Sequence, residues 1–423
     1  MKKIICFLLF ISVIQVSFAQ EPTETIDTLR RDALKLFFDC PFCDEDYIRR
    51  EIPFINYVRD RKEAQVHLMV TSQRTGSGGR EYTFHFLGQN EFEGQNDTLK
   101  YISMTDDTRE LRRKGQTDIM KLGLMWYVAK TPLSKHINIQ YTQPDKEELV
   151  EDKWKSWVFE TRVSSYINAQ QLVKRYYVSG SFSASKVTPD WKLEFDLDQS
   201  IDYEEYVVGE DTVESKTRYE SFDGLIVKSL GEHWSIGGMA DILSYSYSNY
   251  KLRYSVYPAI EYDLFPYSES TRKQLRILYG VGYAFHHYED STIYDKIKEN
   301  LFGHRLSVAL QVRQKWGSIY TYINWRNYFH DWKKNNLSLS ASLRFRIAKG
   351  LEFSVGGSAT RIHDQLSLVK GEATTEDILL RIRELETSYR FYTNFSISYT
   401  FGSIYSNIVN PRFGGSGGGM MYY

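Results

Sequence analysis

Two cysteines are the first residues of this 423-residue chain whose spacing could support chemistry. Cys40 and Cys43 are three positions apart, as in thiol redox motifs and in small disulfide loops. Redox catalysis would need a strand that leads into the motif and a helix whose N-terminus lowers the thiol pKa. Asp44 can cap a helix over 45–58, but the apolar residues of 25–38 have the spacing of a helix rather than a strand. Because an exported chain is free to oxidise its thiols, we expect a structural disulfide.

Histidines close to carboxylates form the second group of residues that could support chemistry. The group consists of His286, His304, His330, Asp331, His363 and Asp364. Imidazole and carboxylate together can bind a divalent metal, and a His–Asp pair can activate water for hydrolysis. Polar loops that contain histidines are the alternative, because nothing in the sequence directs these side chains toward one another. We therefore assign no catalytic residue, no metal ligand and no cofactor. We keep the group as a candidate rim site, named for the barrel mouth at which the strand prediction below places it.

The N-terminus predicts the compartment of these residues. Lys2 and Lys3 precede an apolar run over 4–16, and Ala19 ends a small-residue cleavage site. These features predict a secretory signal peptide over 1–19. No later stretch approaches the roughly 20 apolar residues of a transmembrane helix, which excludes a helical membrane bundle. With 53 basic and 54 acidic side chains, the chain also lacks the basic excess that is typical of nucleic-acid binding.

Residues 20–150 mix helical and strand periods, which predicts a small α+β domain. The expected elements are helices over 44–58 and 107–129 and strands over 64–73, 80–88, 97–104 and 136–142. The first two of these strands read as a hairpin, and His67 and His85 could meet across it. Packing or hydrogen bonding is the role that we expect for this pair, because two ligands alone do not make a zinc site.

Residues 151–403 have a different pattern, in which apolar and polar side chains alternate over long runs. Over 337–347 the odd positions are Leu, Ala, Phe or Ile, and the even positions are Ser or Arg. A soluble β-sandwich would also alternate, but its strands are usually only ~5–6 residues long. Long alternating segments with aromatic ends are typical of a membrane barrel, and seven of the eight tryptophans lie at or beyond Trp154. We therefore predict a mainly β protein, an antiparallel transmembrane β-barrel preceded by the small α+β domain.

About twelve strands are expected, and ten or fourteen remain open. The predicted strands cover 156–168, 173–187, 190–203, 214–229, 233–247, 250–264, 273–288, 303–315, 317–330, 335–347, 350–362 and 386–402. If residues 20–150 face the periplasm, the odd-numbered connections face outward, and they include the long segments 289–302 and 363–384. Most even-numbered connections are tight, as at 315–317. Short periplasmic turns and long outer loops are typical of bacterial barrels, so the lengths agree with this orientation.

Charged side chains line the inner faces of the predicted strands. The set consists of Glu160, Arg162, Lys192, Glu194, Asp196, Asp198, Arg313, Arg326, Arg344 and Arg346. The interior of so narrow a barrel is often filled by side chains, so one interpretation is a salt-bridged lumen that keeps the barrel rigid. The other is a narrow polar conduit for small ions or sugars, with an acidic wall opposite an arginine-lined wall.

The end of the chain carries a family resemblance. The last predicted strand runs into SYTFGSIYSNIVNPRF over 398–413, and a Gly-rich tail covers 404–423. Together with the signal peptide ending in Ala-Gln, this pattern resembles outer-membrane β-barrel proteins of Bacteroidota type, which implies a location and no activity. Residues 20–150 are loosely similar to small periplasmic modules such as that of TolB. Either Phe401 or Phe413 serves as the insertion signal, or the tail is a periplasmic extension.

These features predict an integral outer-membrane protein with a periplasmic domain. Its expected role is non-enzymatic, anchoring a periplasmic protein or peptidoglycan through residues 20–150 within an envelope or secretion assembly. A narrow pore for small polar solutes is the alternative. A hydrolase ranks third, with the rim site acting as in omptin-like barrel proteases; a barrel phospholipase is disfavoured because the chain has no His-x-Ser-Asn-Gly motif. The expected partners are the outer-membrane bilayer and such an envelope component, with no nucleic acid.

Overall fold

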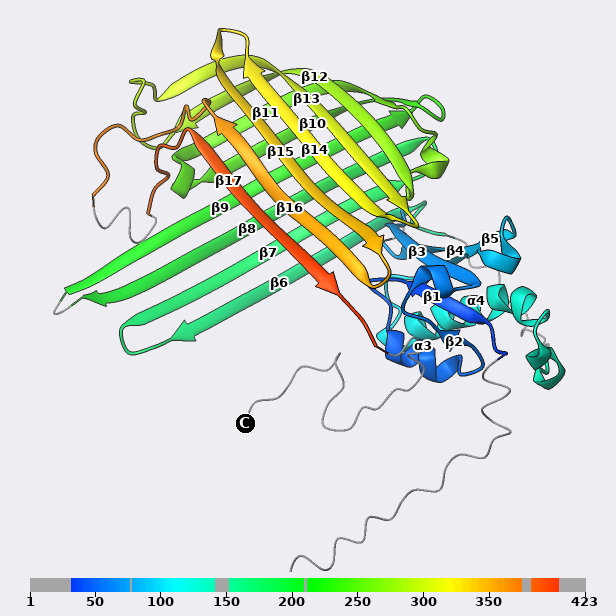
Figure 1. The fold of residues 1–423 in the computed structure, drawn as a ribbon. Coiled ribbons are helices and arrows are strands. Elements are labelled where there is room, and N and C mark those ends of the chain that lie inside the picture. The colour runs from blue at the N-terminus through cyan, green and yellow to red at the C-terminus, as the bar shows by residue number, and fades with distance from the viewer. Residues whose placement is uncertain (1–31, 77, 141–151, 209–210, 375–381, 403–423) are drawn as a thin grey trace, which may run out of the picture.

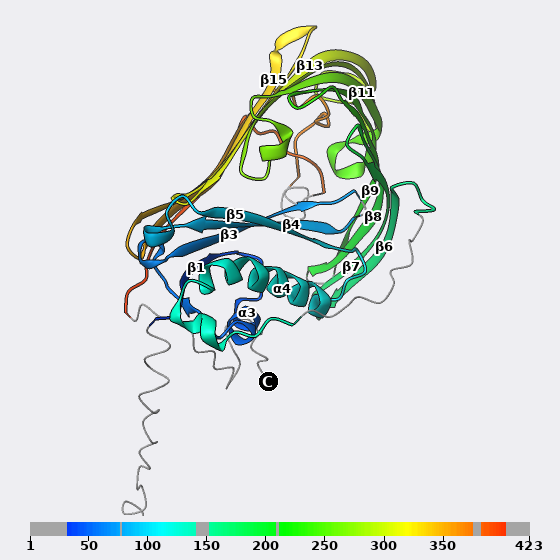
Figure 2. The same ribbon diagram turned by 90° about the vertical axis from the view of Figure 1, so that its right-hand side faces the viewer.

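The structure is a computed structural model that describes residues 32–76, 78–140, 152–208, 211–374 and 382–402. It contains a twelve-stranded sheet and a five-stranded sheet. The large sheet curves into an arch, and the smaller sheet with its helices lies at one end of the arch, between its two legs (Figures 1 and 2). The predicted signal peptide over 1–19 and the predicted tail over 404–423 lie outside the described residues.

The N-terminal unit is a small α+β domain, as the mixed periods predict. Its elements are β1 (Lys35–Asp39), α3 (Glu45–Glu51), β2 (Asn56–Tyr57), β3 (Val66–Arg74), β4 (Arg80–Gly88), β5 (Asn96–Ser103) and α4 (Arg109–Val128). The strand order is β2-β1-β3-β4-β5, with β1 parallel to β2 and β3 and the other neighbours antiparallel. One sheet face packs on α4, where Phe84 and Phe86 meet Met120 and Leu124 in a fully buried core. Across the described ranges, no helix has the length and apolar character needed to cross a membrane.

Two local predictions for this domain are wrong. Residues 35–38 belong to strand β1 and not to a helix, because β1 is paired on both sides, with β2 and with β3. Strand pairing therefore overrides the helical spacing in this part of 25–38, whereas residues 25–31 lie outside the described ranges. In place of a strand over 136–142, a 3-10 helix covers Pro132–His136, and 137–140 belong to no strand. The last two residues of that predicted strand lie outside the described ranges.

The cysteine pair lies between β1 and α3. Cys40 and Cys43 form the expected disulfide. The strand that the redox interpretation requires is present after all, since β1 leads directly into the pair. Asp44 caps α3 by accepting a hydrogen bond from the backbone N–H of Tyr47 at 3.2 Å, and the helix ends at Glu51 because β2 takes up part of the remaining segment. The assignment of the disulfide as structural stays a prediction.

The large sheet is an antiparallel meander in which each strand pairs with its neighbour in sequence. Its strands are β6 (Trp157–Ala169), β7 (Val173–Val187), β8 (Trp191–Val208), β9 (Asp211–Ser229), β10 (Trp234–Tyr245), β11 (Tyr250–Asp263), β12 (Lys273–Tyr288), β13 (Lys298–Gln314), β14 (Gly317–Tyr328), β15 (Asp331–Ala348), β16 (Leu351–Ile362) and β17 (Tyr389–Tyr399). The mainly β class and the count of twelve strands are therefore confirmed. Within the described residues no backbone pairing joins β6 to β17, so the sheet is open between these two edge strands.

The two faces of the large sheet differ in chemistry. On β11 the apolar side chains of Leu252, Val256 and Ile260 are exposed on the convex face. Arg253 points to the concave face, where its guanidinium donates a hydrogen bond to Asp241 on β10 at 3.0 Å. The alternation found in the sequence thus becomes an apolar outer face and a charged inner face.

Candidate functional site

The N-terminal domain covers one end of the arch with the sheet face that α4 leaves free (Figure 2). On this face His67, Met69 and Thr71 of β3 and Thr83 and His85 of β4 are all at most 6% exposed. A sheet covered on one side only would expose every second side chain. Because the side chains on both faces of the small sheet are buried, the large sheet must cover the face that α4 leaves free. The junction of the two sheets is therefore the candidate site.

Asp39, at the end of β1, is the centre of the contacts across this junction. Its Oδ2 accepts a hydrogen bond from Nη1 of Arg346 on β15 at 2.9 Å, and its Oδ1 lies 3.7 Å from Nη2 of Arg313 on β13. Nε2 of His67 lies 3.5 Å from the same carboxylate. Burial opposes ionisation, but His67 and the two guanidinium groups outweigh it and hold the pKa of Asp39 well below its usual range.

The two histidines of the hairpin are kept neutral at this junction. Burial lowers the pKa of His67, and the neighbouring Asp39 only partly reverses the effect. The ring of Phe37 meets that of His67 edge-on at 5.0 Å, and the guanidinium of Arg346 lies 5.1 Å from the Phe37 ring. Burial and the charges of nearby arginines lower the pKa of His85 to about 4. His67 and His85 lie on the same face of the hairpin, but no contact joins their rings among those recorded for the described residues.

Two further contacts hold the domain to both legs of the arch. At the β15–β16 turn, Lys349 forms an ion pair with Glu63 of the domain. At the opposite leg, Nη2 of Arg74 at the end of β3 lies 3.6 Å from Glu160 on β6. A Cβ atom at Gly76, in the β3–β4 turn, would collide with the carbonyl oxygen of Val187. The hairpin therefore spans the arch from one leg to the other, and its tip needs a glycine for the close approach.

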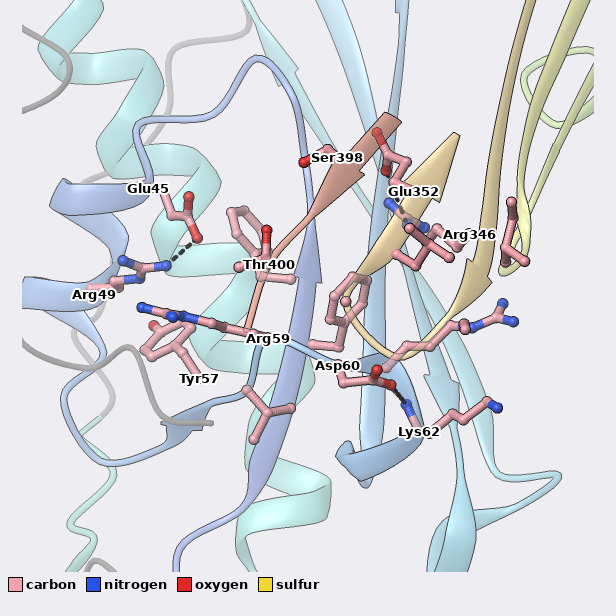
Figure 3. A pocket seen from close by; sticks show the side chains of 18 residues that line it. Glu45, Arg49, Tyr57, Arg59, Asp60, Lys62, Arg346, Glu352, Ser398 and Thr400 are labelled. Atoms are coloured by element: carbon pink, nitrogen blue, oxygen red, sulfur yellow. Dashed lines mark hydrogen bonds and ion pairs between the residues drawn. The ribbon is translucent and has the colours of Figure 1, made fainter. Parts of the chain in front are cut away.

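A groove of about 390 Å³ lies between the domain and the ends of β15–β17 (Figure 3). Its charged lining consists of Glu45, Arg49, Arg59, Asp60, Arg61, Lys62, Arg346 and Glu352. Arg49 pairs with Glu45 at 2.5 Å, and Arg346 has Glu352 at 3.9 Å in addition to the carboxylate at the junction. The cations outnumber the carboxylates, so the groove carries a net positive charge.

A second, larger cavity of about 930 Å³ lies on the concave side of the sheet. Residues of the hairpin tip, such as Arg74, line it together with strands β7–β14. Glu261 accepts a hydrogen bond from the hydroxyl of Tyr267 at 3.1 Å and lies 3.4 Å from Nε of Arg276. Arg305 contributes a guanidinium that lies 5.1 Å from the ring of Tyr257. The cavity therefore has a mixed acidic, basic and hydroxyl-rich lining.

Several of the predicted luminal residues form ion pairs with close neighbours. The pairs are Arg162 with Glu160 at 2.6 Å, Lys192 with Glu194 at 3.2 Å, Arg326 with Asp364 at 2.6 Å and Arg344 with Glu352 at 3.4 Å. Arg313 and Arg346 reach Asp39 of the domain instead. Asp196 and Asp198 form no ion pair with any described residue. The set is thus partly a network inside the sheet and partly a connection to the domain.

The predicted rim residues do not converge on one site. His286 is buried on the concave side, with its Nδ1 3.0 Å from the hydroxyl of Tyr288. His304 lies on the other side, among the rings of Trp325, Phe329 and Trp332. The remaining contacts are Nε2 of His363 at 3.5 Å from Nε of Arg361, the His330 ring at 5.9 Å from Tyr328, and Asp331 accepting from the Lys333 backbone at 2.9 Å. The described residues hold no group of three His, Cys, Asp or Glu arranged for a metal ion.

The end of the arch far from the N-terminal domain is instead filled by the segment 363–370. Asp364 accepts hydrogen bonds from Arg326 at 2.6 Å and from Asn336 at 3.0 Å. Leu366 packs in a small buried cluster with Ala284 of β12 and Leu301 of β13 on the concave side of the arch. The segment 363–370 therefore folds inward, and the carboxylate of Asp364 pairs with a strand arginine rather than with a histidine.

Sequence reasoning misses Asp39, the residue with the most contacts to the other sheet. The apolar run between Lys35 and Asp39 is only three residues long, too short to indicate a strand against the helical spacing around it. It also misses the basic run at 59–62, whose three cations line the groove. Asp223 is a third omission, in register with Asp196 on the neighbouring strand.

Comparisons with known proteins give little similarity. No family model and no curated protein matches the chain. Among solved structures, the translocator domain of the autotransporter NalP from Neisseria meningitidis matches with a TM-score of 0.19 and 8% sequence identity. That match covers 57% of this chain and 81% of the translocator domain. A similarity of this size is a likeness only, so the conclusions below depend on the geometry of the chain itself.

Proposed function

We propose that the chain is an integral outer-membrane β-barrel protein whose N-terminal domain faces the periplasm and anchors an envelope protein at the membrane. One observation carries the proposal: the domain is docked across the end of the twelve-stranded sheet through Asp39, Arg313 and Arg346. In this position the helices α3 and α4 lie on the side of the small sheet that faces away from the large sheet (Figure 2). A partner bound to the helices would therefore be held at a fixed place relative to the barrel.

The outer face of the large sheet supports the membrane part of the proposal. Exposed apolar side chains lie on every strand from β6 to β15 and on β17, and those of β16 are partly exposed. Monomeric soluble proteins rarely expose apolar patches larger than a few hundred Å². In a bilayer the same face contacts lipid, and the backbone groups of the edge strands must find partners. We infer that β6 and β17 pair with each other in the membrane and close the barrel.

The exposed face of α4 supports the anchoring part. Leu111, Leu122 and Trp126 are 54%, 64% and 48% exposed, and their spacing of eleven and four residues places them on one side of the helix. Nζ of Lys130 lies 3.3 Å from the centroid of the Trp126 ring. An exposed row of Leu and Trp beside charged residues is typical of protein-binding surfaces. We therefore expect a protein partner on α4, and treat peptidoglycan as the alternative outcome of the test.

Cell fractionation tests the membrane part. The full chain should be recovered with the outer membrane after alkaline washing, and it should migrate faster in an unheated gel sample than in a boiled one, as folded barrels do. Recovery of the chain in the soluble periplasmic fraction would contradict the proposal.

Photo-crosslinking in cells tests the anchoring part. A photoreactive side chain at Leu122 should give an adduct with one envelope protein, and Trp126→Ala should reduce its yield because it removes a ring next to the contact. The matched control carries the same photoreactive group at Asp106, an exposed position in the loop before α4. An adduct with peptidoglycan would replace the protein partner, and equal labelling at both positions would argue against a binding surface on α4.

A narrow conduit is the second candidate function, because the cavity of about 930 Å³ on the concave side has a charged and hydroxyl-rich lining. The domain covers one end of this space and the segment 363–370 fills the other, so solute passage would need one of them to move. Single-channel recording in a planar bilayer tests this candidate. Steady current from the native chain would favour the conduit over the anchor.

A further inference from the structure

We propose that the groove between the N-terminal domain and the ends of β15–β17 binds the phosphate headgroup of an anionic phospholipid in the periplasmic leaflet. The inference rests on the proposed function, because it takes these strand ends to lie at the membrane surface. The groove has a volume of about 390 Å³, which suits a headgroup and leaves the acyl chains outside. It combines a cationic side formed by the domain with an apolar side formed by the strands.

The cationic side contains charges that the protein leaves unsatisfied. Arg59, Arg61 and Lys62 form no ion pair with any described residue, although all three line the groove. Asp60, which lies between them in sequence, is buried and accepts a hydrogen bond from the backbone N–H of Lys62 at 2.8 Å. Asp60 is one carboxylate against three cations, so the run keeps a net charge of +2, and the cations still repel one another. The groove is therefore a place where a bound anion lowers the electrostatic energy.

The type of cation favours phosphate. Arg59 extends toward Tyr57 and Arg49, as Figure 3 shows. The guanidinium of Arg49 lies 5.6 Å from the centroid of the Tyr57 ring, and its charge is partly satisfied by Glu45. Planar guanidinium groups bind phosphate oxygens through two parallel hydrogen bonds, which a lysine ammonium cannot do. Two arginines on one wall thus match a phosphate better than a single carboxylate.

The apolar side points to a lipid rather than to free phosphate. Ile347 and Leu351 line the groove, and Ile347 is 63% exposed. Both side chains lie on the outer face of the sheet. Phe345 and Phe353 are paired in register on that face, and Ile347 and Leu351 are each two positions from one of them. Trp316 stacks on Phe345 at 5.6 Å, the position that aromatic side chains take at a membrane surface. An acyl chain along this row would place its phosphate at the mouth of the groove, whereas inorganic phosphate has no use for the row.

Lipid titration of the purified full chain tests the inference. The chain is freed of lipid in a neutral detergent, and binding is counted by native mass spectrometry. The probes are short-chain phosphatidylglycerol, phosphatidylcholine with the same chains, inorganic phosphate and a soluble peptidoglycan fragment. Phosphatidylglycerol should bind best, because the groove carries an excess of positive charge. Each basic residue near anionic lipid strengthens binding by roughly fivefold, so Arg59→Ala with Arg61→Ala should weaken phosphatidylglycerol binding by about tenfold or more.

Matched variants separate the groove from general surface charge. Arg50→Ala with Lys135→Ala removes two exposed cations of the same domain that do not line the groove, and it should leave lipid binding unchanged. Lys62→Glu is a second groove variant, because its side chain is exposed and its change need not disturb the fold. Heat-modifiable migration of each variant confirms that the barrel is intact before binding is compared.

Four outcomes would overturn the inference. Native-like phosphatidylglycerol binding by both groove variants excludes the groove, and equal binding of phosphatidylcholine excludes recognition of negative charge. Equal affinity for inorganic phosphate identifies a free-anion site, and binding of a peptidoglycan fragment that the groove variants alone abolish reassigns the groove to the cell wall. The proposed function is tested separately: a chain found in the outer membrane whose groove variants bind lipid normally refutes only this inference. A chain absent from the outer membrane refutes the proposed function.

Discussion

Replacing Asp39 with asparagine removes the charge that joins the two sheets and keeps the size of the side chain. The Asp39 side chain is 14% exposed, and those of Arg313 and Arg346 are 13% and 20% exposed. Removal of one partner from a buried ion pair costs about 3–5 kcal/mol, because the other charge stays buried without compensation. Arg346 keeps Glu352 at 3.9 Å, and these groups are not fully buried. We therefore expect Asp39→Asn to weaken docking by about 2–3 kcal/mol, or roughly 30- to 150-fold in the docking equilibrium.

The labelling rate of a cysteine at position 71 measures this equilibrium. Thr71 is 2% exposed and faces the junction, so a thiol introduced there reacts only when the domain separates from the large sheet. In the full chain with its native disulfide intact, Asp39→Asn should raise the rate by the factor given above, and Asp106→Asn, at an exposed position, should not. If Asp39 acts through Arg346, adding Arg346→Gln to the Asp39 variant should cost less than the sum of the two single changes. A rate within threefold of the native chain, or strict additivity, would refute the role of Asp39 in holding the domain to the large sheet.

Three further predictions use the same geometry. Acidification from pH 7.5 to 5.5 should raise the labelling rate relative to a free thiol, because His67 and His85 stay neutral in the docked domain and become protonated when it is released. Docking is at full strength above pH 6.5 and weakens as the pH falls toward 4; at pH 5.5 the loss of docking free energy from His85, whose pKa is about 4, is about 1 kcal/mol. A pH-independent rate would contradict this prediction. Gly76→Val should raise the rate about fivefold or more, because its side chain collides with the opposite leg of the arch at a cost of about 1–3 kcal/mol. A native rate would mean that the tip does not touch the sheet. His330→Ala with His363→Ala should leave growth and hydrolysis of peptide and lipid esters unchanged, and a loss of hydrolysis would revive the rim enzyme.

The strands of the large sheet could be predicted because each one carries its own evidence. Alternation over ten or more residues marks a strand whatever its partners are, and the predicted 173–187 and 273–288 coincide with β7 and β12. The largest errors lie at the strand ends far from the N-terminal domain, where β13 begins at Lys298 instead of at 303. Beyond the apolar band the outward side chains no longer need to be apolar, so the pairing continues after the alternation has ended.

The junction could not be predicted, because its partners are far apart in the chain. Asp39 and Arg346 are 307 positions apart, and no local pattern connects them. Sequence reasoning assigns Arg346 to the lumen by its parity on the strand, which gives the direction of the side chain but not what covers the strand end. The rim residues are separated for a related reason: His304 is in register with Val281, five positions along β12 from His286, and the two histidines lie on opposite faces of the sheet.

Both ends of the sheet use the same kind of contact, and this similarity bears on function. At one end Asp39 of the domain meets Arg313 and Arg346, and at the other Asp364 of the inward loop meets Arg326. A buried ion pair adds little stability compared with an apolar contact of the same size, but it fixes how two parts are oriented. Orientation matters little for a passive pore, which these contacts obstruct, and it is essential for a domain that must present α4 to a partner at a fixed distance from the membrane. The distribution of the inner charges therefore favours the anchor over the conduit.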